Sequence, residues 1–169
     1  SEVARLLETS VAAVNSARQR ARATVAALPA DAGPAPLDEL DAELLARYVD
    51  AFERYDIERL VTLLHEDAVM SMPPFAMWLK GADDIGTFLL QPGPSLCRGS
   101  RLLPVAANGC PAFGQYKPDP GGGHRPWGLQ VLEVSGGRIV GFHCFLDTQR
   151  IFPVFGLPPH LPAQSDQVE

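Results

Sequence analysis

Cysteine is scarce in this chain of 169 residues, and long apolar runs are missing altogether. The three cysteines, Cys97, Cys110 and Cys144, are scattered and form no CxxC pair, which argues against a structural zinc site and suits a reducing compartment. No apolar run reaches the roughly 18 residues that a membrane span needs. The first residues do not form a basic-then-apolar signal peptide. The sequence therefore predicts a cytoplasmic protein with no membrane partner.

Signals for metal, phosphate and nucleophile sites are also missing. The Gly-Gly-Gly-His run at 121–124 lacks the Lys-Ser/Thr of a phosphate loop, and no helix is predicted after it. No serine lies in a nucleophile elbow. We expect no metal and no cofactor, because the four histidines lack metal-ligand spacing: His65, His124, His143 and His160.

Charge is distributed unevenly along the chain. The net charge of −6 argues by itself against a nucleic-acid binder. However, residues 1–27 carry four arginines and two glutamates, a net +2, whereas residues 28–169 carry a net −8. Three prolines in 28–37 indicate a semi-rigid linker. We therefore predict a small basic unit at 1–27, a Pro/Ala-rich linker at 28–37, a domain at 38–163 and a disordered tail at 164–169.

The basic unit has the pattern of two helices joined by a tight turn. Apolar residues fall at helical spacing over 3–7, and Thr9 or Ser10 can cap a second helix over about 11–27. A polar and basic outer face is typical of a helix-turn-helix, whose second helix reads base edges near its N-terminus while arginines hold phosphates. An ordinary solvated helix face is the alternative. The candidate DNA-binding residues are Ser10, Ala12, Ala13, Asn15, Ser16, Arg18, Gln19, Arg20 and Arg22.

The rest of the chain predicts helices followed by strands. Apolar residues recur every three to four positions over 40–64, with Asp56 capping the second of two helices, and a third helix begins at about 81 and ends near 90. The tail from Phe152 is rich in proline and predicts an irregular arm. Helices followed by a long sheet predict an α+β domain, with three helices on a curved, mostly antiparallel sheet. The predicted strands are 68–72, 75–78, 102–108, 112–117, 127–134 and 138–146.

Three helices packed on a curved sheet would leave a cone with an apolar interior. That interior is a candidate pocket. An isomerase-type site would need a carboxylate base and acidic donors in such a pocket. His143, Phe145 and Asp147 share one strand face by alternation, and Tyr116 and Asp67 are further candidates. The alternative is structural: a core histidine, and an aspartate that caps the next turn. The predicted pocket residues are Met70, Met72, Phe75, Trp78, Phe113, Tyr116, Trp127, His143, Phe145 and Asp147.

Two segments resemble known families. The run VAAVNSARQRAR at 11–22 resembles the second half of region 4 in bacterial sigma factors of the extracytoplasmic-function type. That resemblance implies a remnant of the helix-turn-helix that reads the −35 promoter element. From residue 40 onward the chain resembles the SnoaL-like branch of the nuclear transport factor 2 superfamily, which implies a conical α+β barrel. The motifs are YVDAFERYDIERL at 48–60, LHEDA at 64–68, WLKG at 78–81, FLD at 145–147 and FGLPP at 155–159.

In this order the two segments resemble the C-terminal half of an actinobacterial sigma factor with a SnoaL-like extension, of the sigma factor G or J kind. The resemblance implies core RNA polymerase and promoter DNA as partners. It also implies that the extension regulates sigma activity and does not catalyse a reaction. Two alternatives stay open. One is a stand-alone SnoaL-like or ketosteroid-isomerase-like enzyme, and the other is a binding module, for which a small-molecule ligand would be a further partner.

Overall fold

The computed structural model describes residues 2–27, 39–93 and 97–163. The chain divides into two compact units, Ser1–Ala35 and Pro36–Glu169. The predicted linker at 28–37 and the predicted tail at 164–169 lie outside the described residues. Each unit is therefore considered by itself.

The first unit is a pair of helices, α1 (Glu2–Leu6) and α2 (Val11–Ala26). The backbone N–H of Ala13 donates to Oγ of Ser10 at 3.0 Å, which confirms Ser10 as the N-cap of α2. Ala4 is buried in α1, whereas Leu6 is 80% exposed. Two short helices cover little apolar surface between them, so most side chains of this unit face solvent.

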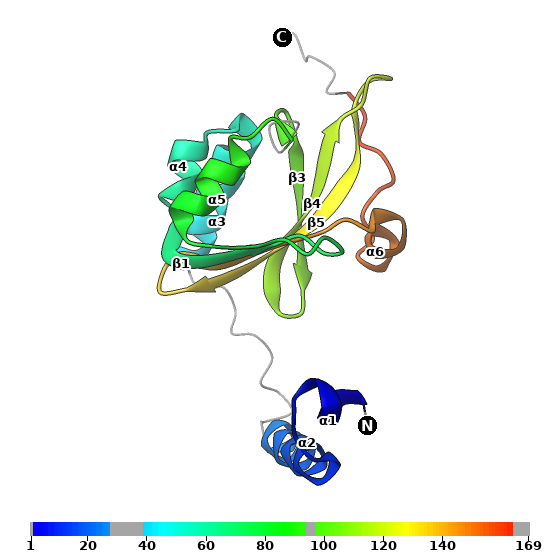
Figure 1. Cartoon of the computed structure of the whole chain (residues 1–169). Coiled ribbons are helices and arrows are strands. Elements are labelled where there is room, and N and C mark those ends of the chain that lie inside the picture. The colour runs from blue at the N-terminus through cyan, green and yellow to red at the C-terminus, as the bar shows by residue number, and fades with distance from the viewer. Residues whose placement is uncertain (1, 28–38, 94–96, 164–169) are drawn as a thin grey trace, which may run out of the picture. The chain divides into compact units, whose positions relative to one another are not determined.

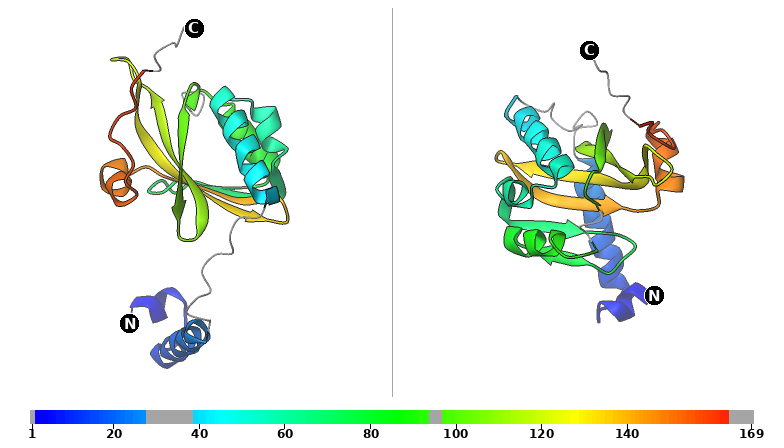
Figure 2. Two further views of the ribbon diagram at one scale, coloured as in Figure 1. Left: turned by 180° about the vertical axis from the view of Figure 1, so that it is seen from behind. Right: turned by 90° about the horizontal axis from the view of Figure 1, so that it is seen from above.

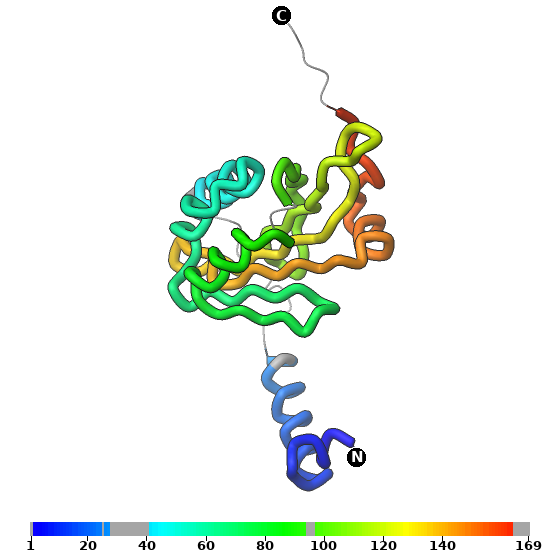
Figure 3. The backbone as a smooth tube through the Cα atoms, turned by 45° about the horizontal axis from the view of Figure 1, so that its top comes forward, coloured from blue at the N-terminus to red at the C-terminus, as the bar shows by residue number. Residues whose placement is uncertain are grey.

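The second unit contains a six-stranded sheet and the remaining helices (Figure 1). Its sheet order is β2-β1-β6-β5-β4-β3, with β1 and β6 parallel and all other neighbours antiparallel. Figure 3 shows β1 and β6 side by side, although they are far apart in the sequence. The elements are α3 (Glu39–Arg54), α4 (Ile57–Val61), β1 (Leu64–Ser71), β2 (Trp78–Lys80), α5 (Ala82–Leu89), β3 (Arg101–Ala107), β4 (Cys110–Pro118), β5 (His124–Ser135), β6 (Arg138–Phe145) and α6 (Thr148–Val154).

The two faces of the sheet carry different helices. Helices α3, α4 and α5 lie on one face, and α6 lies on the other (Figures 1 and 2). The larger core forms under the three helices and includes Tyr48, Phe52 and Phe142, all nearly inaccessible to solvent. A smaller core forms under α6, where the ring of Phe152 lies 5.2 Å from that of Tyr116. The predicted α+β cone is confirmed, but the sheet is open: in the described chain β2 and β3 remain its edges.

The predicted helix pattern of 40–64 is realised by α3 and α4. Asp56 caps α4, since its Oδ1 accepts a hydrogen bond from the backbone N–H of Arg59 at 3.0 Å. On the exposed side, Asp50 forms ion pairs of 2.6 Å with both Arg54 and Arg59. These exposed pairs join the two helices but contribute little stability. The buried face of the helices, packed on the sheet, supplies most of it.

Three predicted elements differ from the structure. The first strand begins at Leu64, four residues before the predicted start, because the chain pairs with β6 as soon as α4 ends. The predicted strand at 75–78 is wrong: 75–77 lie outside any strand and pairing begins at Trp78. The predicted irregular arm begins three residues late, because α6 occupies 148–154 and the irregular chain follows it. The burial of Phe152 against the sheet stabilises that helix despite Pro153.

None of the helices in the described part of the chain has both the length and the apolar character that crossing a bilayer requires.

Candidate functional site

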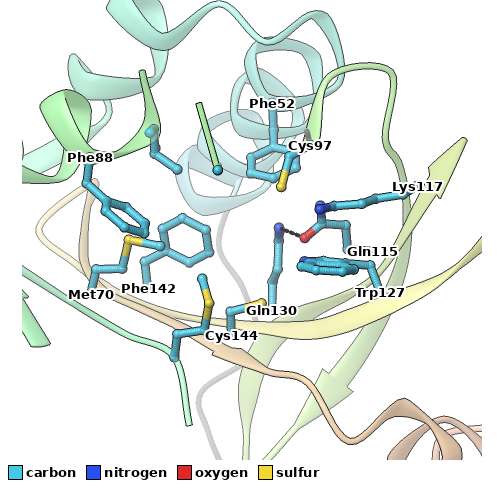
Figure 4. Close-up of a pocket in the computed structure, with 13 residues that line it drawn as sticks. Phe52, Met70, Phe88, Cys97, Gln115, Lys117, Trp127, Gln130, Phe142 and Cys144 are labelled. Carbon is cyan, nitrogen blue, oxygen red and sulfur yellow. Dashed lines mark hydrogen bonds between the residues drawn. The ribbon is translucent and has the colours of Figure 1, made fainter. Parts of the chain in front are cut away.

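A cavity of about 150 Å³ lies in the second unit, between the sheet and the helices that cover its inner face (Figure 4). Its wall is apolar except for two glutamines and one lysine. Four strands, two helices and the segment after α5 contribute to it. The lining residues are Phe52, Met70, Met72, Phe88, Leu89, Gly93, Cys97, Gln115, Lys117, Trp127, Gln130, Phe142 and Cys144.

A chain of four buried polar side chains runs along one wall. The hydroxyl of Tyr48 donates to Oε1 of Gln130 at 2.8 Å. Nε2 of Gln130 donates to Oε1 of Gln115 at 2.9 Å, the bond drawn in Figure 4, and Nε2 of Gln115 donates to Oγ of Ser100 at 3.0 Å. All four residues are almost fully buried. Each glutamine accepts a hydrogen bond at its amide oxygen and donates one from its amide nitrogen. The two bonds hold each amide group in one orientation.

Among the described residues that form the cavity wall, Lys117 alone is charged. It is 5% exposed, and its Nζ lies 3.2 Å from the ring centroid of Trp127. Such a cation–π contact contributes about 0.5–2 kcal/mol. In Figure 4 its side chain extends from β4 toward the cavity beside Gln115 and Trp127.

Strand alternation and a bulge bring Lys117 and Trp127 together. Gln115 and Lys117 are two positions apart on β4, so they share the inner face. Opposite them, Gln115 pairs with Gly128 and the next residue pairs with Pro126, which leaves Trp127 as the extra residue of a β-bulge. A bulge re-aims a side chain. The indole therefore turns onto the cavity face, where the ammonium contacts it.

Burial also controls the thiol and the phenol at this site. The pKa of Cys144 is raised to about 12, chiefly by burial and in part by the nearby Cys97, while Lys117 acts in the lowering direction. Burial raises the pKa of Tyr48 well above its ordinary value, and the two thiols add to that effect. Both groups are therefore neutral at physiological pH. A neutral thiol is a poor nucleophile, so the cavity presents Cys144 as an apolar surface.

Three of the predicted pocket residues line the cavity: Met70, Met72 and Trp127. Phe113 is buried one layer away, in the core, where its ring lies 5.7 Å from that of Tyr48. Tyr116 and Phe145 belong to the core under α6, because strand alternation turns them to the outer face.

The proposed acid–base residues also lie outside the cavity lining. His143 alternates with Phe142 and Cys144, so it faces away from the cavity. Its Nδ1 forms a 2.8 Å hydrogen bond with Oγ of Ser71, and its Nε2 lies 3.6 Å from Oε1 of Glu133. These contacts hold the imidazole on the outer face of the sheet.

The other predicted candidates are exposed. Trp78 is 69% exposed, with its ring 6.4 Å from that of His143, and Phe75 is 62% exposed. Asp147 precedes α6 but its carboxylate caps no backbone N–H; it lies 3.6 Å from Arg150. Asp67 forms an exposed ion pair with Lys80 at 3.0 Å. These positions do not converge on one site.

Seven apolar lining residues were not predicted from the sequence, namely Phe52, Phe88, Leu89, Gly93, Cys97, Phe142 and Cys144. The three polar ones, which lie within apolar strands, were not predicted either. Gln115, Lys117 and Gln130 stand at alternate positions of β4 and β5, on the face that packs under the helices. The signal was present as the period-2 row of Phe113, Gln115 and Lys117.

The predicted DNA-binding residues lie at the start of α2 and along it, and all of them are exposed. Asn15, Ser16 and Gln19 share one side of the helix by their spacing, with arginines on both flanks. Nη1 of Arg20 donates to Oγ of Ser16 at 2.7 Å, and Oγ of Ser10 is used by the N-cap. A helix with this surface is accessible to a partner, and its contact with DNA stays a prediction.

In the ranges that the structure covers, no three of the His, Cys, Asp and Glu side chains gather in a group able to hold a metal ion.

Comparisons with known proteins give one family match and two kinds of relative. Residues 45–142 match the SnoaL-like domain family. The chain is 44% identical to "ECF RNA polymerase sigma factor SigG" from two strains of Mycobacterium tuberculosis, over 95% of this chain and 44% of that protein. It therefore spans less than half the length of these curated relatives. These two matches confirm the resemblance to a SnoaL-like domain and to an extracytoplasmic-function sigma factor, whereas the role of residues 11–22 in reading a promoter stays a prediction.

Solved structures share the fold of the second unit. An NTF-2 like protein of unknown function from Burkholderia xenovorans LB400 aligns with a TM-score of 0.54 at 17% identity, over 65% of this chain and 84% of that chain. An LEH-like epoxide hydrolase from M. tuberculosis aligns with a TM-score of 0.50 at 17% identity, over 71% of this chain and 92% of that chain. Identities this low show the fold and nothing finer.

Proposed function

Since this chain belongs to the SnoaL-like domain family, we propose that it is the C-terminal part of an extracytoplasmic-function sigma factor whose SnoaL-like domain regulates transcription initiation. The observation that carries the proposal is the 44% identity to a sigma factor over 95% of the chain, since that match includes both units. On this proposal the partners are core RNA polymerase and promoter DNA, and the protein acts in the cytoplasm.

Helix α2 is the element we assign to the −35 region of the promoter. Its exposed polar residues can reach base edges, and Asn15 has the amide that pairs bidentately with adenine. The arginines on its flanks suit phosphates. A single pair of helices supplies few phosphate contacts and lies in a chain whose other residues are net acidic, so strong binding requires the rest of the sigma factor and the polymerase.

Replacing Arg18 with alanine in the full-length protein is expected to weaken promoter binding by the polymerase holoenzyme. If the guanidinium neutralises one phosphate, the slope of log affinity against log salt falls by about 0.9. A titration of labelled promoter DNA at several salt concentrations measures that slope. Arg150→Ala is the matched control, since Arg150 is an exposed arginine of α6, and it should leave the slope unchanged. An unchanged slope for Arg18→Ala would remove this residue from the interface.

Deleting residues 38–169 from the full-length protein is expected to change promoter-specific transcription, because the deletion removes the regulatory domain and keeps the predicted DNA-binding helix. Run-off transcription with core polymerase on a promoter that the protein serves measures the change. A parallel binding assay with core polymerase shows that the shortened protein still assembles. Equal transcript from the two proteins would overturn the regulatory role.

A cone-fold enzyme is the alternative function. Its candidate base and acid, Asp147 and His143, lie outside the cavity, on a strand end and on the outer sheet face. Catalysis by such an enzyme would require the carboxylate base to contact the substrate inside the cavity. The arrangement of polar groups in the cavity instead favours the binding of a ligand.

A further inference from the structure

Lys117 is a buried cation without an acidic partner in the described part of the chain. Its side chain is 5% exposed. None of the ion pairs formed among the described residues involves its ammonium, which lies over the indole ring of Trp127. Buried charges in proteins are ordinarily paired, because removing an ammonium from water is unfavourable. A cation–π contact offsets only part of that cost.

The neighbouring polar groups also offer hydrogen-bond donors. A glutamine side chain has two N–H donors. Gln115 uses one of them on Ser100 and Gln130 uses one on Gln115, while both amide oxygens already accept a bond. Each amide nitrogen therefore keeps one N–H that the chain of bonds does not use. An ammonium and two spare N–H groups along one wall suit an acceptor that carries negative charge.

The rest of the cavity wall determines the size and the apolar character of the ligand. Away from Lys117 the cavity is lined by aromatic rings and sulfur-containing side chains, among them Met70, Phe88 and Phe142. A cavity of about 150 Å³ is the size that accepts a molecule such as benzene. The ligand must therefore be small and apolar over most of its surface, with a single acidic group at one end.

We propose that this cavity is a binding site for a small carboxylic acid in its anionic form. The carboxylate pairs with Nζ of Lys117 and accepts an N–H from Gln115 or Gln130, and the apolar body lies against Phe88 and Phe142. The binding site is inferred from the cavity and its lining residues alone. Its role as the signal input of a transcription regulator rests on the function proposed above.

The test is a titration of the whole 169-residue chain with benzoate, and with benzamide as a neutral isostere, followed by NMR of the methionine methyl groups. Met70 and Met72 line the cavity, whereas Met77 does not, so the third methyl group is an internal control. Benzoate is expected to shift the first two signals saturably and to leave Met77 unmoved. Benzamide is expected to bind about 10- to 100-fold more weakly, because it lacks the charge that the ammonium pairs with.

Lys117→Met removes the charge and keeps an unbranched apolar side chain of similar length. It should weaken benzoate binding by about 10- to 100-fold and leave benzamide binding nearly unchanged. Lys80→Met makes the same substitution at an exposed site and should change neither affinity. Absence of saturable benzoate binding, or equal benzoate affinity before and after Lys117→Met in a folded protein, would overturn the proposal.

The assay contains no polymerase and no DNA. A negative binding result therefore removes the acid site and leaves the sigma-factor proposal standing. Equal transcription by the full-length and shortened proteins in the deletion experiment would remove the regulatory role and leave the acid site standing.

Discussion

Replacing Gln130 with methionine is expected to lower the free energy of unfolding of the SnoaL-like domain by about 2–6 kcal/mol. The substitution keeps the volume of the side chain but leaves two buried groups without partners: the hydroxyl of Tyr48 and Oε1 of Gln115. Each buried group that loses its hydrogen bond costs about 1–3 kcal/mol. Since small domains are stable by about 5–15 kcal/mol, this single change removes a large share. Urea unfolding followed by circular dichroism measures it.

Two further variants make this prediction specific. Tyr48→Phe removes one bond of the chain and should cost about 1–3 kcal/mol by itself. Combined with Gln130→Met it should add much less than that, because the hydroxyl has already lost its acceptor. Gln149→Met, on the exposed side of α6, is the matched control and should stay within about 0.5 kcal/mol of the unsubstituted chain. Fully additive costs would show that Tyr48 and Gln130 act independently.

Lys117→Met, in contrast, is expected to stabilise the ligand-free domain by about 1–3 kcal/mol. The substitution replaces a largely buried lysine that has no acidic partner among the described residues with an apolar side chain. Replacing a whole buried ion pair with apolar side chains is often stabilising by about this amount, and here no partner charge is left behind. The lost contact with Trp127 offsets part of the gain. The same urea titration measures the difference, and Lys80→Met should lie within about 0.5 kcal/mol of the unsubstituted chain.

The sign of that result tests the functional interpretation. A residue that costs stability in the free protein is typical of a site that a ligand completes. Destabilisation by Lys117→Met would mean that the fold already compensates the charge, and the ammonium would then be part of the structure. Benzoate at saturating concentration should narrow the stability difference between the two proteins, because it binds the folded form with lysine more tightly.

Much of the fold was predictable from the sequence because its elements have strong periodic patterns. The helices α3 and α4 follow from apolar spacing and the Asp56 cap, and β4, β5 and β6 lie within a few residues of their predicted ranges. The errors occur where tertiary contacts decide. The strand β1 extends back to Leu64 because of its pairing with β6, and α6 is stabilised by Phe152 in the outer core. Neither contact is visible in a local window.

The cavity was only partly predictable, for a different reason. Met70, Met72 and Trp127 were expected to line it and do. The prediction placed His143 there as well, since alternation groups residues on one face without saying which face is covered by helices. The contact between Trp127 and Lys117 was not predicted, because it depends on a bulge, which inserts one residue and has no signature in this sequence. Lys117 was missed because a lysine in a strand ordinarily points to solvent.

The parallel pairing of β1 with β6 has a consequence for synthesis of the protein. Val69 pairs with Gly141, a partner that the ribosome adds 72 residues later. Translation adds about 5–20 residues per second, so about 4–14 seconds pass between the synthesis of β1 and that of its partner strand β6. Helices α1 and α2 precede this sheet in the chain and their described hydrogen bonds are local, so they can form earlier. Nascent chains therefore pass through an interval in which the basic helices have emerged while the domain that follows them has not yet folded.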